Sequence, residues 1–215
     1  MSYFQLTVKK FFLKDGSLDL YAFLFGLLFL FTFAFMQLPA WLIILASTVL
    51  ASSVFRYITT DELFHEEFVK LSSPWEVIDY ILSKNLFIFL FELILWFSAF
   101  LLLSFLKVFG FYPQAIVDKG SLLIQLLFVL GTENIILLFF NNSVKSYQKG
   151  LRRNSKEDIA TGLENFKSLL PSIASNSMIA LLCFLLKKNL GLCLALGYYG
   201  ICLVIFVIVR TKWMV

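Results

Sequence analysis

The sequence predicts an all-α membrane protein with six transmembrane helices, an N-terminal amphipathic helix and a short cytoplasmic helix between the second and third spans. Of its 215 residues, 60% are hydrophobic and only 15% are charged. A soluble domain of this size cannot bury so much apolar surface. The apolar residues also gather in runs close to the roughly 20 residues with which a helix crosses the hydrocarbon core of a bilayer.

Six apolar runs fit transmembrane helices. They cover residues 18–35, 38–54, 86–106, 121–140, 169–186 and 190–209. With this layout, most of the 18 lysines and arginines lie on the side that carries both termini, and the exceptions are Lys107, Lys119, Lys187 and Lys188. This bias predicts that both termini are cytoplasmic, in a multi-pass protein of a bacterial inner membrane. It also explains the net charge of +4 without a nucleic-acid partner.

Residues 1–16 form the predicted N-terminal amphipathic helix. Phe4, Val8 and Phe11 recur at helical spacing on one face, while lysines fall largely on the other. Such a helix lies in the membrane interface with its lysines near the headgroups. The pattern fits either a simple positively charged anchor or an elbow that leads into a transport domain.

Residues 56–84 are the only long polar interruption in the first half of the chain. Thr60 or Asp61 can cap a helix that runs to about Leu71. A turn follows, and Pro74 fits the first turn of a second helix that continues through residue 84 into the third span. Ser73 is its expected cap. This segment therefore predicts a helix, a turn and a helix on the cytoplasmic side.

A second cytoplasmic segment, residues 141–167, is strongly basic and has no apolar core of its own. Its charges can be solvated, or they can meet anionic lipid headgroups.

Two acids, Glu92 and Glu133, lie inside the predicted spans, where ionisable residues are costly, and Asn134 is a further polar candidate there. Glu92 lies about 9 Å and Glu133 about 10 Å along their helices from the same cytoplasmic side. Matching depth on antiparallel neighbours allows the two carboxylates to face one cavity. The alternative is that hydroxyl and amide groups, such as those of Thr132 and Asn134, satisfy each carboxylate separately.

Several motifs are absent from the sequence. It contains no GxxxxGK[ST] loop to hold ATP, no HExxH and no GxSxG. His65 is the only histidine, and the three cysteines are not spaced for a metal site. We therefore expect no metal centre in this chain, and we do not expect it to be an enzyme.

The segment before the third span resembles the permease subunits of the type-2 ABC exporter family. Ser73, Pro74 and Lys84 form an S-P-x9-K pattern, and the family carries a similar pattern between its second and third spans. Acidic and apolar residues precede it here, namely Glu66, Glu67, Phe68 and Leu71. The six-span layout extends the resemblance over nearly the whole chain. The chain is also distantly similar to the haem-exporter B subunit of cytochrome c maturation.

This resemblance implies that residues 56–84 form a coupling segment whose short helix docks on a separate ATPase subunit. The implied docking residues are Phe64, Glu66, Glu67, Phe68, Leu71 and Pro74. ATP and Mg²⁺ would bind the partner, so this chain needs no cofactor. A second permease copy or a paralogue would complete the transporter among membrane lipids. Two alternatives remain: a six-span substrate-binding module, and an intramembrane enzyme that uses Glu92 and Glu133.

Overall fold

The regular structure of the described chain is entirely helical. The computed structural model describes residues 3–13, 40–60, 70–110, 119–139 and 188–212, together with residues 26, 28, 174, 175, 178, 179, 181, 182 and 185. Its helices are α1 (Tyr3–Leu13), α3 (Ala40–Thr60), α5 (Pro74–Val108), α6 (Lys119–Phe139) and α8 (Lys188–Lys212). No strand occurs among these residues. The prediction of an all-α fold is confirmed for this part of the chain.

Three of the helices are long and apolar enough to cross a membrane. They cover Pro74–Val108, Gly120–Leu138 and Asn189–Lys212, which are the places predicted for the third, fourth and sixth spans. The run predicted for the second span is helical as α3, but its apolar part, Leu42–Phe55, is shorter. The runs predicted for the first and fifth spans, and the basic segment 141–167, lie wholly or largely outside the described residues.

The start of α5 is set by a local sequence signal. The Ser73 hydroxyl accepts a hydrogen bond from the Glu76 N–H over 3.3 Å, which caps the helix. The Glu76 carboxylate in turn accepts from the Ser72 N–H over 2.8 Å, and Pro74 occupies the first turn. The predicted turn and cap are confirmed. The 35 residues of α5 span about 52 Å, so the helix extends beyond a hydrocarbon core of roughly 30 Å.

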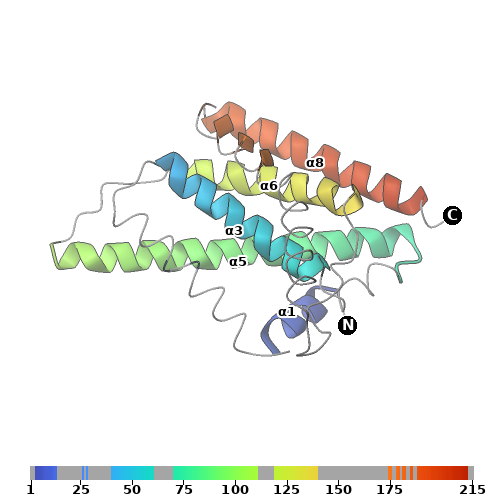
Figure 1. The fold of residues 1–215 in the computed structure, drawn as a ribbon, viewed down its shortest axis with the longest axis horizontal. Helices are drawn as coiled ribbons and strands as arrows, with labels where there is room; N and C mark the ends of the chain where they lie inside the picture. The colour runs from blue at the N-terminus through green and yellow to red at the C-terminus, as the bar shows by residue number, and fades with distance from the viewer. Residues whose placement is uncertain are drawn as a thin grey trace, which may run out of the picture.

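Figure 1 shows how the helices are arranged around α5. Helix α3 crosses α5 and also packs on α6, and α6 packs most extensively on α8. Helix α1 lies along α5 on the side away from α6 and α8. Helix α5 runs opposite to α3, α6 and α8, so that its first residue and their last residues point toward the same end of the molecule.

One face of α5 carries a row of exposed apolar side chains. The row consists of Leu82, Leu86, Leu90, Leu93, Phe97, Leu101 and Phe105. Its spacing of three or four residues is that of a single helix face. A contiguous apolar surface of this length is rare on soluble proteins, and lipid is the solvent that suits it.

The apolar face of α1 packs against α5. Phe11 is 2% exposed, and its ring centroid lies 4.9 Å from that of Phe87. Gln5 and Lys9 are exposed. A helix is therefore present over Tyr3–Leu13, and its apolar side contacts protein where the sequence alone predicts the lipid interface.

Candidate functional site

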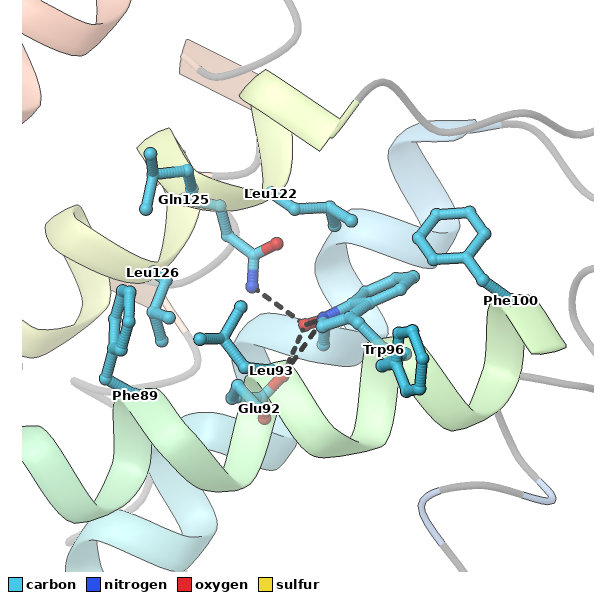
Figure 2. Close-up of a pocket in the computed structure, with 11 residues that line it drawn as sticks. Phe89, Glu92, Leu93, Trp96, Phe100, Leu122, Gln125 and Leu126 are labelled. Atoms are coloured by element: carbon cyan, nitrogen blue, oxygen red, sulfur yellow. Dashed lines mark hydrogen bonds between the residues drawn. The ribbon is translucent and has the colours of Figure 1, made fainter.

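A pocket of about 230 Å³ lies between α3, α5 and α6 (Figure 2). Its walls are mostly apolar and rich in aromatic rings, and one carboxylate and one amide interrupt them. The lining residues are Ser47 from α3, Phe89, Glu92, Leu93, Trp96, Phe97 and Phe100 from α5, and Leu122, Leu123, Gln125 and Leu126 from α6.

The Ser47 hydroxyl is the centre of a hydrogen-bond network at this pocket. It donates to Glu92 Oε2 over 3.1 Å and accepts from Gln125 Nε2 over 3.0 Å. The indole N–H of Trp96 is 3.2 Å from Ser47 Oγ and 3.1 Å from Glu92 Oε2. The dashed lines in Figure 2 mark these hydrogen bonds, which lie between the labelled side chains of Gln125, Glu92 and Trp96. The network joins three helices at one level.

Helical geometry brings these groups together. Glu92 and Trp96 are four residues apart and therefore share a face of α5. Serine is short enough for α3 to approach that face closely. Glu92, Gln125 and Ser47 are all at most 1% exposed, so their mutual hydrogen bonds offset part of the desolvation of a polar group in an apolar surrounding.

Two acceptor atoms of this network have no partner. Glu92 Oε1 and Gln125 Oε1 are buried, and neither forms a hydrogen bond with the residues that the structure describes. The pocket beside them is lined by the same two side chains.

Glu133 lies outside the pocket and bonds to a different serine of α3. Its carboxylate accepts a hydrogen bond from the Ser52 hydroxyl, and it does not line the pocket. Ser52 follows Ser47 by five residues, or about 7.5 Å along α3. The two carboxylates thus lie at different levels, in contrast to the matching depth inferred from helix lengths. The offset arises because each acid meets its own serine on α3.

Of the two groups proposed from the sequence as partners of Glu133, Thr132 bonds elsewhere and Asn134 forms no hydrogen bond through its amide with the described residues. The Thr132 hydroxyl donates to the Phe128 carbonyl over 2.9 Å and lies 3.1 Å from the Tyr198 hydroxyl. Asn134 is 0% exposed, and neither atom of its amide has a hydrogen-bond partner among the described residues.

A second buried polar contact joins α1 to α5. Lys84 is 0% exposed, and its Nζ donates to Thr7 Oγ1 over 2.8 Å. The same Nζ lies 5.1 Å from the centroid of the Tyr80 ring, within the range of a cation–π interaction. The last residue of the S-P-x9-K pattern thus holds the N-terminal helix against α5.

The proposed docking residues lie in two situations. Phe64, Glu66, Glu67 and Phe68 lie outside the described residues. Pro74 is exposed at the start of α5. Leu71 is non-helical and only 4% exposed, because its side chain belongs to the core of the chain itself. The interpretation of Leu71 as a partner-facing residue on a helix is therefore corrected.

The sequence reasoning identified Glu92 but missed Ser47, Trp96 and Gln125. The spacing of four residues between Glu92 and Trp96 places them on one helix face and could have indicated their contact. The serines of α3 gave no such signal, because small polar residues are common in apolar runs.

Comparisons of the chain with models of known protein families, with curated proteins and with solved structures found no match.

Proposed function

We propose that the chain is the transmembrane permease subunit of an ABC exporter. It would work in a dimer with a second copy or a paralogue, and with separate ATPase subunits that bind ATP and Mg²⁺. The observation that best supports this function is the continuity of α5, which joins the predicted coupling segment to the pocket.

Helix α5 is one continuous helix that can transmit a displacement from its first turn to the pocket. Pro74 marks its cytoplasmic end in this proposal, and Glu92 lies 18 residues further along, or about 27 Å. No break interrupts the helix between them. A displacement applied at its first turn by a partner would reach the pocket wall without passing through a loop. Because Lys84 of α5 bonds to Thr7 of α1, α1 would move together with α5.

The positions of charged residues support the proposed orientation. Lys84 lies in the first third of α5, while Arg210 and Lys212 lie in the last turn of α8. These segments point to the same end of the molecule, which is the cytoplasmic end if Lys and Arg follow the usual bias. Cysteines introduced at Lys119 and at Arg153 should then react with impermeant reagents from opposite sides of the membrane. Labelling of both from outside would overturn the orientation.

The docking function is tested by a pair of substitutions. We expect Phe68→Ala to weaken association with the ATPase subunit, because buried apolar anchors supply most interface energy, roughly 2 kcal/mol or more each. Leu71→Ala should instead lower the stability of the chain, because Leu71 is a core residue. Arg152→Ala should do little, because solvated charges contribute little. Equal loss of association from Phe68→Ala and Arg152→Ala would contradict a specific docking site.

The pocket favours one alternative, the six-span substrate-binding module. Such a protein would bind a small molecule tightly without any ATPase. An intramembrane enzyme that uses both acids is less well supported, because Glu92 and Glu133 bond to different serines. Co-purification with or without a P-loop protein separates the permease from the binding module.

A further inference from the structure

Two side chains that line the pocket, Glu92 and Gln125, have acceptor atoms with no hydrogen-bond partner among the described residues. Glu92 Oε1 and Gln125 Oε1 are both buried and unpartnered within the described part of the chain. The indole N–H of Trp96 is already used within the network, and one of the two N–H groups of Gln125 donates to Ser47. A ligand that completes this site must therefore donate hydrogen bonds.

The charge of the site defines the ligand further. A carboxylate in a membrane span is strongly disfavoured unless it meets a cation or a proton. Among the described residues, Glu92 bonds to a hydroxyl and an indole, and both are neutral. An ammonium group would supply the missing positive charge together with two or three donors.

The aromatic and aliphatic residues that line the rest of the pocket favour a ligand with a flat apolar ring. Phe89, Trp96, Phe97 and Phe100 contribute aromatic rings. Such rings attract cations through their faces and pack well against other rings. Since a cavity of about 150 Å³ is enough to hold one benzene ring, the volume of about 230 Å³ has room for a ring with a short amino-bearing arm.

The pocket also lies next to lipid. Two of its lining residues, Phe97 and Leu93, belong to the exposed apolar row of α5, with exposed fractions of 65% and 49%. A ligand that partitions into the bilayer would reach the pocket from this side. Amphipathic amines have this property, and inorganic cations do not.

We propose that this pocket binds a small organic cation, a primary or secondary ammonium on an aromatic body, with its nitrogen at Glu92 and Gln125. Both side chains line the pocket, and rotation of their terminal groups would turn the buried oxygens toward the ligand, because such sp³–sp² torsions have broad minima. If the organic cation is the transported substrate, the inference rests on the permease function proposed above. The binding site itself does not depend on that function and can be tested with this chain alone.

The binding test uses the full chain in lipid nanodiscs and 2-phenylethylamine as the probe. We expect saturable binding above that of empty nanodiscs. Propylbenzene has nearly the same shape but no donor and no charge, and it should compete at least 10-fold more weakly. Glu92→Gln should weaken amine binding at least 10-fold, while Glu133→Gln, an acid outside the pocket, should change it less than 2-fold.

Several results would overturn the assignment: no saturable binding, equal competition by propylbenzene, or equal losses from the two acid variants. If Glu92→Gln fails to fold, Leu123→Trp gives the same test, because the larger ring would fill the pocket from a partly exposed position. Unchanged amine binding by a folded Leu123→Trp protein would also overturn it. Loss of the amine site with intact ATPase association would leave the permease function standing. Amine binding without an ATPase would remove the permease function and leave the site.

Discussion

The hydroxyl of Ser47 on α3 donates a hydrogen bond to the carboxylate of Glu92 on α5 over 3.1 Å. Because Ser47 also accepts from Gln125 on α6, one small side chain fixes the relative positions of three helices. Apolar contacts alone do not distinguish protein from lipid in a bilayer. A directional contact of this kind therefore defines the packing at the pocket.

Ser47→Ala should destabilise the protein by about 1–2 kcal/mol, because it removes a buried hydroxyl and leaves the Gln125 amide without a partner. Ser53→Ala is the matched control. Ser53 lies on the same helix, is exposed, and donates only to the Val49 carbonyl of its own helix, so its removal should change stability by less than about 0.5 kcal/mol. Unfolding of both variants by denaturant in mixed micelles gives the comparison. Equal effects would show that the network adds nothing to stability.

The two intramembrane acids should behave independently. Glu92 and Glu133 bond to different serines, and groups separated by more than 7–10 Å usually contribute additively within about 0.5 kcal/mol. The loss in unfolding free energy for the double Gln variant should therefore equal the sum of the single losses. Glu92→Gln combined with Ser47→Ala should depart from additivity, because those groups are in contact. A strong coupling between the two acids would indicate a shared cavity.

Lys84→Met and Thr7→Val should be coupled. Their side chains meet over 2.8 Å between α1 and α5, and contacting polar groups show coupling energies of roughly 0.5–3 kcal/mol. Lys9→Met combined with Thr7→Val is the control, since Lys9 is exposed and residues two apart on a helix do not face each other. Proteolysis within α1 should also rise in Lys84→Met. Additive energies for Lys84 and Thr7 would show that their hydrogen bond does not hold α1 in place.

Gly131→Ala should loosen the contact between α6 and α8. A Cβ at Gly131 would lie 2.9 Å from the Tyr198 ring, which must then move and disturb the pairing of Tyr198 with Thr132. Overpacking of this kind destabilises by about 1–3 kcal/mol. Gly197→Ala meets no atom within 4 Å and should be neutral or stabilise by up to about 1 kcal/mol, since alanine favours helix. Thermal unfolding in detergent distinguishes the two, and a stable Gly131→Ala protein would contradict the tight packing.

Local signals in the sequence predicted the helices well. Ser73 and Pro74 predicted the start of α5, because capping depends on residues next to one another in the chain. Apolar composition located the three long helices. The same reasoning failed for Leu71, whose periodicity looked amphipathic, because burial within the chain's own core is a tertiary property.

The candidate site was only partly predictable for the same reason. Glu92 stood out because a carboxylate in a span is unusual. Its partner Ser47, and Gln125 that donates to Ser47, lie 45 and 33 positions away along the chain. Their approach depends on the rotation and offset of neighbouring helices. Glu92 and Glu133 lie at similar distances from the ends of their predicted spans, and these distances did not show that the two acids meet serines five residues apart on α3. The sequence analysis therefore placed both carboxylates at the same depth.

Association with an ATPase is the most direct test of the permease function. The chain should be purified from its native membranes in gentle detergent after crosslinking, and the preparation assayed for Mg²⁺-dependent ATP hydrolysis and for its protein content. A permease subunit should bring with it a separate P-loop ATPase, and Phe68→Ala should release that subunit without lowering the melting temperature of the chain. Recovery of the folded chain from crosslinked membranes without any P-loop protein would contradict the proposed function.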